Sequence, residues 1–233
     1  KKKYNFILQK KNKDIIKIIL SKPQGSKTKV KINYNNTIFN YSLNLIGTFQ
    51  LENLYNAIML SVSSGLKIKQ VFKVLPKVKP IKGRLNVFTK HNKTICLDYA
   101  HTPDGLKKVI ITLKNHFKKK VNIVFGCGGN RDKGKRIKMG KIVKKLCNKI
   151  IITNDNPRFE NPVEINKQIY NSIKRGLIIS NRKLAISKGI KNLAYNEVLL
   201  IAGKGHENYQ IINDKKIYFS DHEEILKNLW KHF

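Results

Sequence analysis

VNIVFGCGGNRDKGKR, residues Val121–Arg136, joins an apolar run to a glycine-rich, basic loop. The apolar run is typical of a buried strand, and the lysine-rich stretch after the loop predicts a helix that begins near Ile137. Gly129–Arg136 matches the P-loop pattern G-x-x-x-x-G-K-[ST] except at its last position, where Arg136 replaces the hydroxyl residue that would bind magnesium. The loop is therefore expected to bind an anion without a metal, through the helix N-terminus and its glycine amides, or else to be a solvated turn.

The same alternation of strand and helix continues on both sides of this stretch. Lysine-rich segments of helical length separate five β-rich apolar runs, which read TICLDYA, VNIVFGCG, KIIITND, GLIIS and EVLLIAGKG. This alternation is typical of βαβ units and predicts an α/β domain with a mostly parallel sheet. Polar motifs follow several of these strands, and in open α/β sheets ligands bind at the carboxyl ends of strands. We therefore expect the motifs to converge on one crevice.

The first third of the chain has a different pattern. Residues 1–45 form short alternating runs separated by Gly, Ser and Asn turns, which predicts an antiparallel meander. A helix is expected over Gln50–Ser64, ending before Gly65, with one apolar face made by Leu51, Leu54, Ala57, Ile58 and Val62. A second helix is expected over Ile68–Leu75, and the Pro- and Lys-rich stretch PKVKPIKGR after it is the candidate linker.

Composition restricts the function only weakly. The formal net charge of +34 is consistent with binding to nucleic acid or an anionic surface. However, only six of the 48 basic residues are arginines, and abundant Lys, Asn and Ile also follow from A/T-rich codons. Because lysine is so readily placed in this chain, each arginine that remains suggests a need for a planar, bidentate donor.

The three cysteines occur without C-x-x-C spacing, which argues against a disulfide framework or a zinc site and favours a reducing cytosol. No apolar run approaches the roughly 18 residues of a membrane span, and the basic start has too short an apolar stretch for a signal peptide. The chain also begins without Met, so we expect it to be a piece of a longer protein.

Two strand-end motifs carry candidate site residues. LDYAHTPDGL places Asp98 and His101 where a carboxylate meets a ribose hydroxyl and a histidine orients a phosphate or moves a proton. Thr102 and Pro103 in the same motif also suit an N-cap and first position of a helix. The second motif, TNDNPRFENP, holds Asp155, Asn156 and Arg158 around a proline that fixes the backbone.

Those three side chains suit a zwitterion, since Asp155 would meet an ammonium group and Arg158 would take a carboxylate in a two-point contact. Asn-Pro and Asp-Asn are also ordinary turn formers. A further strand-end motif, AGKGHENYQ, offers Gly203 for close backbone approach to a ligand, with charge from Lys204, His206 and Glu207.

Taken in order, LIGTFQLENLYNAI, GRLNVF, DYAHTPDGL, FGCGGNRDKGKR, TNDNPRFENP and AGKGHENYQ resemble the Mur ligases, and most closely the diaminopimelate-adding branch. The resemblance runs from about Leu43 to the end. It implies an ATP-dependent amide ligase of peptidoglycan precursor synthesis, in which ATP activates the D-glutamyl carboxylate of UDP-MurNAc-L-Ala-D-Glu as an acyl phosphate. The amino group of meso-diaminopimelate then attacks that acyl phosphate. It also implies a Rossmann-like C-terminal domain over 83–233, preceded over 1–82 by the strand and helix tail of the central ATPase domain.

The resemblance also implies roles for particular residues. Those expected to bind diaminopimelate are Arg131, Asp155, Asn156, Pro157, Arg158, Gly203 and Glu207, and those expected to contact ATP are Asn53, Arg84 and Asp98. Arg158 is expected to separate diaminopimelate from lysine, which has no second carboxylate. No general base is evident from spacing, and His101 is the candidate.

The family's P-loop, modified lysine, magnesium ligands and UDP-binding domain are expected upstream, so we expect this chain alone to be inactive. Gln50 stands where the family commonly has Asn, and Asn86 also departs from the pattern after the G-R pair. We expect a monomeric, cytoplasmic protein with small-molecule substrates and no specific nucleic-acid or membrane partner. The alternatives are a lysine-adding Mur ligase and, from another class, a basic nucleic-acid-binding module.

Overall fold

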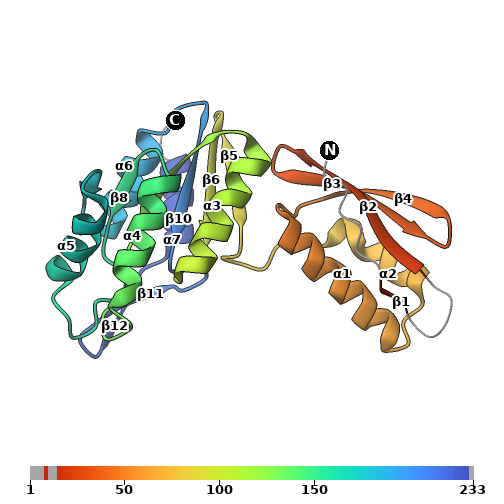
Figure 1. Ribbon diagram of the computed structural model, residues 1–233, viewed down its shortest axis with the longest axis horizontal. Coiled ribbons are helices and arrows are strands. Elements are labelled where there is room, and N and C mark those ends of the chain that lie inside the picture. Colours follow the sequence, from red (N-terminus) through yellow and green to blue (C-terminus); the bar gives the residue numbers. More distant parts are fainter. Residues whose placement is uncertain (1–7, 10–14, 231–233) are drawn as a thin grey trace. The chain divides into compact units, whose positions relative to one another are not determined.

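The structure is a computed structural model that describes residues 8–9 and 15–230. It divides into two compact units, Lys1–Pro80 and Ile81–Phe233. Each unit has its own sheet and its own hydrophobic core, as the ribbon diagram shows (Figure 1).

The first unit is an antiparallel sheet covered by helices (Figure 1). Its strands pair in the order β1-β2-β3-β4, and their bounds are β1 Leu8–Gln9, β2 Ile15–Gln24, β3 Lys27–Tyr34 and β4 Thr37–Leu43. The helical segments that follow are α1 Thr48–Ser63, α2 Ile68–Val74 and the 3-10 turn η1 Leu75–Lys77. Alternate residues of β3, such as Val30 and Ile32, are buried, so one face of the sheet packs onto the helices.

The predicted meander is confirmed for residues 15–43, whereas residues 1–7 and 10–14 lie outside the described part of the chain. Both predicted helices are also present. The expected apolar face of α1 is wrong at Ala57, which is exposed, while Tyr55 is 3% exposed. The aromatic ring fills more of the space under the sheet than a methyl group does, so it takes the buried position.

The second unit contains a six-stranded sheet in the order β5-β6-β10-β7-β8-β9. The strands are β5 Asn86–Lys90, β6 Lys93–Asp98, β7 Lys120–Phe125, β8 Ile150–Ile152, β9 Leu177–Ile178 and β10 Glu197–Ala202. All neighbours run parallel except the edge strand β5, which pairs antiparallel with β6. The predicted α/β class with a mostly parallel sheet is therefore confirmed.

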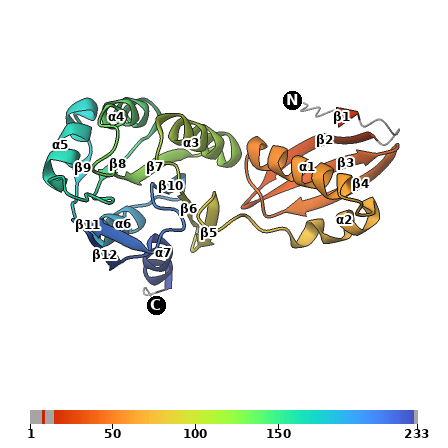
Figure 2. The same cartoon turned by 90° about the horizontal axis from the view of Figure 1, so that it is seen from below.

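Helices cover both faces of this sheet, as Figure 2 shows. One face carries α3 Pro103–Phe117, α4 Gly134–Leu146 and α5 Pro162–Ile173, and the other carries α6 Arg182–Lys191 and α7 Asp221–Trp230. Burial on both faces explains why β10 is buried at every position and reads as a continuous apolar run.

Local contacts account for the starts of both α3 and α4, although only that of α3 was predicted. Thr102 caps α3 by accepting from the Gly105 amide, and Pro103 occupies the first turn, as predicted. Helix α4 begins at Gly134, one turn earlier than the predicted Ile137. The Asp132 carboxylate accepts from the Gly134 amide at 2.8 Å and so turns the chain into the helix before the first apolar position.

A hairpin that the sequence pattern did not predict lies beyond β10. Strands β11 Tyr209–Ile212 and β12 Lys215–Tyr218 pair antiparallel through a tight turn with Asn213 at φ 55°. The hairpin meets the loop after β8, where Arg158 forms an isolated bridge with Ile212. It therefore belongs to the surroundings of the predicted site.

Candidate functional site

The loops after β6, β7, β8 and β10 surround a cavity of about 450 Å³ at the carboxyl edge of the parallel sheet. The predicted residues that line it are His101, Arg131, Asp155, Asn156, Arg158, Gly203 and Glu207. The sheet thus brings together four sequence motifs that are far apart in the chain. The expectation that the strand-end motifs converge on one crevice is confirmed.

The glycines of the loop after β7 make room for the loop after β8. A Cβ atom on Gly126 would lie 2.1 Å from the Thr153 carbonyl oxygen, and one on Gly129 would lie 1.9 Å from that of Pro157. The Gly129 amide donates to the Asn156 carbonyl at 2.9 Å. The interpretation that this loop's glycine amides are set out for an anion is therefore wrong at Gly129, whose amide joins the two loops.

Arg136, the residue that departs from the P-loop pattern, is fully buried beside this cavity and is not among the residues that line it. Its Nη2 atom donates to both carboxylate oxygens of Glu160 at 2.9 and 2.8 Å, and Nη1 donates to Gln168 at 2.8 Å. Burial alone would raise the pKa of Glu160, but hydrogen bonds from the Asn130 amide and Arg136 hold that pKa below its ordinary value. Arg136 therefore ties α4 to the chain leading into α5.

An acidic pair forms one wall of the cavity, with a buried lysine between the two carboxylates. Asp155 is 7% exposed and Lys204 is 0% exposed. The Lys204 Nζ atom lies 2.9 Å from Asn156 Oδ1, 3.0 Å from Glu207 Oε2 and 3.7 Å from Asp155 Oδ1. The Asn156 amide group also donates to Glu207 Oε2, at 3.1 Å. This network fixes the two carboxylates relative to each other.

Arg158 also lines the cavity, and the unpredicted hairpin holds its backbone. Its own amide donates to the Ile211 carbonyl at 3.0 Å, and its carbonyl accepts from the Asn213 amide at 2.9 Å. Its backbone has φ 51°, a left-handed conformation that non-glycine residues seldom adopt. The Nη1 atom donates to the Gly129 carbonyl at 2.9 Å. The guanidinium is thus anchored at one end while its side chain lines the cavity.

Tyr99 is a residue of the site that the sequence interpretation missed. It lines the cavity, and its hydroxyl donates to Glu207 Oε1 at 3.3 Å. The Arg84 guanidinium stacks on the Tyr99 ring, 4.5 Å from its centroid, and the His101 ring packs against the same ring. The signal that could have found Tyr99 is its position directly after a strand end, which it shares with the predicted residues.

The residues assigned to ATP by resemblance lie outside this cavity's lining. Both carboxylate oxygens of buried Asp98 accept backbone amides, from Leu85 at 2.8 Å and Ala100 at 2.7 Å. Burial raises the pKa of Asp98, although these two hydrogen bonds oppose the rise. Asn53 is exposed on α1 in the first unit. Their roles toward a nucleotide stay predictions.

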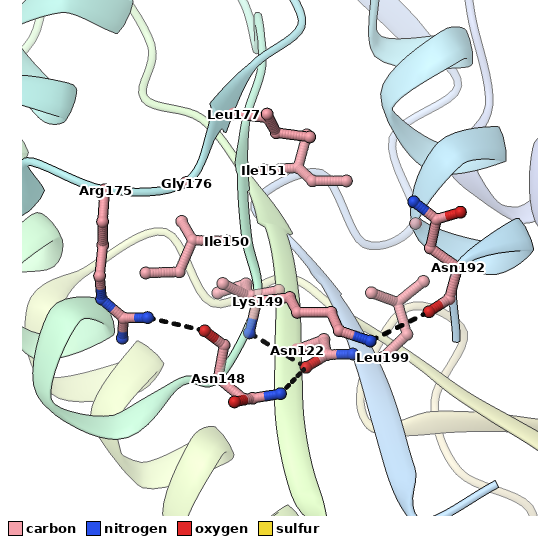
Figure 3. A pocket seen from close by; sticks show the side chains of 12 residues that line it. Asn122, Asn148, Lys149, Ile150, Ile151, Arg175, Gly176, Leu177, Asn192 and Leu199 are labelled. Atoms are coloured by element: carbon pink, nitrogen blue, oxygen red, sulfur yellow. Dashed lines mark hydrogen bonds between the residues drawn. The ribbon is translucent and has the colours of Figure 1, made fainter. Parts of the chain in front are cut away.

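A second cavity, of about 350 Å³, lies at the other edge of the same sheet and contains none of the predicted residues. Ile150, Leu177 and Leu199 contribute to its apolar surface, as Figure 3 shows. Its polar side chains are engaged with their neighbours. For example, Lys149 bonds to the Asn192 carbonyl at 3.2 Å and forms an ion pair with Glu197 at 2.9 Å. The first cavity, which has charged groups facing a ligand-sized space, is therefore the candidate site.

Within residues 8–9 and 15–230, no helix is long and apolar enough to cross a membrane. The same residues contain no group of three or more His, Cys, Asp or Glu side chains placed to hold a metal ion. The three cysteines are buried as free thiols.

Comparisons with known proteins agree with this arrangement. The family model described as "Mur ligase, glutamate ligase domain" matches residues 83–205. The UDP-N-acetylmuramoyl-L-alanyl-D-glutamate--2,6-diaminopimelate ligase of Rickettsia prowazekii (strain Madrid E) is 46% identical over 202 residues, which cover 85% of this chain and 42% of that protein. The same-named protein of Prochlorococcus marinus (strain NATL1A) is 42% identical over 200 residues, covering 82% of this chain and 39% of that protein.

The solved structure of a UDP-N-acetylmuramoyl-L-alanyl-D-glutamate--2,6-diaminopimelate ligase superposes on this chain with a TM-score of 0.67 and 32% sequence identity. The superposition covers 96% of this chain and 46% of that one. The chain thus spans about two fifths of the length of the curated relatives it matches.

Proposed function

This chain belongs to the Mur ligase family, and on that premise we propose that it supplies the amino-acid-binding part of an ATP-dependent ligase that adds meso-diaminopimelate to UDP-MurNAc-L-Ala-D-Glu. The printed names of the relatives at 46% and 42% identity support this choice of substrates. In the proposed reaction, the D-glutamyl carboxylate is activated as an acyl phosphate, the amine nitrogen attacks its carbonyl carbon, and phosphate leaves as the amide bond forms.

One observation carries the proposal: an acidic pair and two guanidinium groups line the same cavity. Asp155 and Glu207 both form ion pairs with Lys204, and Arg131 and Arg158 line the same cavity. A carboxylate takes an ammonium group and a guanidinium takes a carboxylate in a fork-like contact. One end of diaminopimelate carries both an ammonium group and a carboxylate. The buried Pro157 between Asn156 and Arg158 restricts the backbone there, so that Asp155 and Arg158 keep a fixed spacing.

Arg158 gives this site a reason to prefer diaminopimelate over lysine. Lysine has an ammonium group at its distal end but no carboxylate there for the Arg158 guanidinium. A charged hydrogen bond contributes about 1.5–3 kcal/mol, which corresponds to roughly ten- to hundredfold selectivity. The lysine-adding alternative is therefore the weaker proposal.

The attacking amine must lose a proton before or during attack. His101 lines the cavity, and its Nδ1 atom lies 2.9 Å from the Tyr99 carbonyl oxygen, which orients the ring. Because that carbonyl can only accept, Nδ1 carries the proton in this geometry and Nε2 is the acceptor. We therefore propose that His101 Nε2 takes up the proton of the attacking amine.

Arg84, Asp98 and Asn53 are the residues proposed for the nucleotide. Arg84 is exposed and stacked on Tyr99, so its guanidinium has a rigid support from which to contact an anion. ATP supplies the phosphoryl group that activates the carboxylate. Magnesium is usually held by one or two protein carboxylates together with substrate phosphates, and no residue of the described chain is assigned to it.

The proposal is tested by isothermal titration of meso-diaminopimelate and of L-lysine into the 233-residue chain. We expect diaminopimelate to bind at least roughly tenfold more tightly than lysine, and Arg158→Ala to abolish that difference. Lys183→Ala, which removes one exposed positive charge from α6, is the matched control and should change neither affinity. Equal affinities for the two amino acids in the unaltered chain would refute the proposal.

A further inference from the structure

Lys204 is a buried cation that lies behind the candidate site instead of lining it. Its side chain is 0% exposed, and it is absent from the residues that face the cavity. Its Nζ atom nevertheless lies within 3.0 Å of Glu207 and Asn156 and 3.7 Å from Asp155, all three of which do face the cavity. The ammonium group therefore donates hydrogen bonds to two of these residues and forms a longer ion pair with the third, Asp155.

In each carboxylate, Lys204 contacts one oxygen and not the other. Glu207 uses Oε2 for Lys204 and Asn156, while its Oε1 atom is turned to the Tyr99 hydroxyl. Asp155 uses Oδ1 toward Lys204, and a Cβ atom on Gly203 would lie 2.9 Å from its Oδ2 atom. Glycine at position 203 therefore leaves Asp155 Oδ2 accessible from that side.

The formal charges of this group give a net charge of −1, from two carboxylates and one ammonium. Without Lys204, Glu207 would lose the cation that lies 3.0 Å from its carboxylate and would take up a proton more readily. A net charge of −1 matches one ligand ammonium group. Removing Lys204 would thus change what the wall can bind without removing any atom that lines it.

We infer that Lys204 is a positioning residue: through Asn156 it fixes the Asp155–Glu207 pair that receives one ammonium group of a zwitterionic amino acid, and by its charge it keeps Glu207 ionised. The identity of that ligand rests on the proposed function, but the effect on the carboxylates does not. The motif AGKGHENYQ by itself indicates a charge near the site at Lys204 but no role for it.

The charged groups around Glu207 support this direction of effect. Burial tends to raise the pKa of Glu207, but the charge and hydrogen bond of Lys204 together with the hydrogen bonds from Asn156 and Tyr99 outweigh burial, so that the pKa lies below its ordinary value. The other charged groups nearby are Asp155, which shares Lys204, and Arg182, whose positive charge interacts with both carboxylates. Lys204 is the cation in direct contact with Glu207.

The first arm of the test needs no ligand. The side-chain carboxyl of Glu207 is followed by carbon-13 NMR through a pH titration in the unaltered chain, Lys204→Met and Lys204→Gln. We expect Glu207 to titrate below its ordinary range in the unaltered chain and above it in both variants, because glutamine keeps a hydrogen-bond donor but not the charge. Lys149→Met, which removes an exposed lysine from its 2.9 Å pair with Glu197, is the matched control and should leave Glu207 unchanged.

The second arm measures the affinity for meso-diaminopimelate at about pH 6 and about pH 8.5. The unaltered chain should bind equally at both. Lys204→Met should bind roughly tenfold or more weakly at the lower pH and recover part of this loss at the higher pH, where the carboxylate is ionised again. A purely structural tie between loops would instead give a loss that is the same at both pH values.

The outcomes separate the two ideas. An unchanged Glu207 titration in both variants, or an equal loss of affinity at both pH values, overturns the inference about Lys204. Failure of the unaltered chain to bind diaminopimelate counts against the proposed function, and the ligand-free titration still decides the role of Lys204.

Discussion

Replacement of Arg182 by methionine should cost the second unit much of its stability. Arg182 and Asp221 are both 0% exposed and form a two-point ion pair, with Nε and Nη2 each 2.7 Å from a carboxylate oxygen. The same guanidinium donates to the Asn154 carbonyl at 3.3 Å and the Ala202 carbonyl at 3.0 Å. Asn154 precedes Asp155 and Ala202 precedes Gly203, so this one side chain joins the bases of two site loops to helix α7.

The magnitude follows from what Arg182→Met leaves behind. Burial by itself lowers the pKa of Arg182, yet the contact with Asp221 raises it above the ordinary value, so the charged form is stabilised by that carboxylate. Without the guanidinium, Asp221 is a buried and uncompensated charge, and loss of one partner of such a pair costs about 3–5 kcal/mol. For a domain of this size, that corresponds to a fall in Tm of roughly 6–20 °C.

Urea unfolding followed by far-UV circular dichroism gives the free energy of unfolding for Arg182→Met, Asp221→Leu and the double variant. We expect the double variant to be more stable than Arg182→Met, because it removes both buried charges together. A loss below about 1 kcal/mol in Arg182→Met, or a double variant whose loss equals the sum of the single losses, would refute this reasoning.

Three further expectations concern the glycines of the site loop, the loss of stability at low pH and the binding of DNA by this basic chain. Gly129→Ala should weaken diaminopimelate binding and lower the free energy of unfolding by about 1–3 kcal/mol, because its Cβ atom would lie 1.9 Å from the Pro157 carbonyl oxygen. Gly134→Ala, whose Cβ atom would have its nearest contact at 3.1 Å, should be tolerated, and calorimetry of both variants checks this. The pKa of Glu197 lies below its ordinary value, because hydrogen bonds from the Ala194 amide, Lys149 and Asn122 outweigh burial. The stability that Glu197 contributes is therefore present above its unfolded pKa and is lost as the pH falls through its folded pKa. Glu197→Gln should make the free energy of unfolding depend less on pH in that window. Binding to DNA, measured by fluorescence anisotropy, should fall steeply with salt and show no sequence preference, and a clear preference would favour the nucleic-acid alternative.

Local pattern was enough to predict the parallel strands and the loops that follow them at the site. The strand-end motifs around Asp155 and Glu207 are short, and a parallel sheet necessarily brings its carboxyl ends to one edge. The hairpin β11–β12 was missed because its strands are four residues each and most of their residues are exposed or half-buried, so little periodic burial marks them. That hairpin nevertheless holds the backbone of Arg158.

Side-chain direction was beyond the reach of sequence pattern. Arg136 and Lys204 both occur in motifs that invite a ligand, yet both are fully buried. Their direction depends on Glu160 and Asp155, partners that are distant in sequence and that only the packed loops bring close. Charge in a strand-end loop thus indicates a site, but whether a given cation faces the ligand or its binding residues is a tertiary property.

The distribution of arginine supports the ligase interpretation of this very basic chain. Where lysine is abundant, arginine is expected only where several donors must be held in one plane. Arg136, Arg175 and Arg182 each donate hydrogen bonds to at least two different residues, and Arg175 bonds to the carbonyls of Lys144, Cys147 and Asn148. Lysine cannot reproduce such forked contacts. The charge of +34 is carried mainly by lysines, whereas Arg131 and Arg158 line the cavity and Arg136, Arg175 and Arg182 join neighbouring segments, so most of the arginines occupy positions that lysine would not fill.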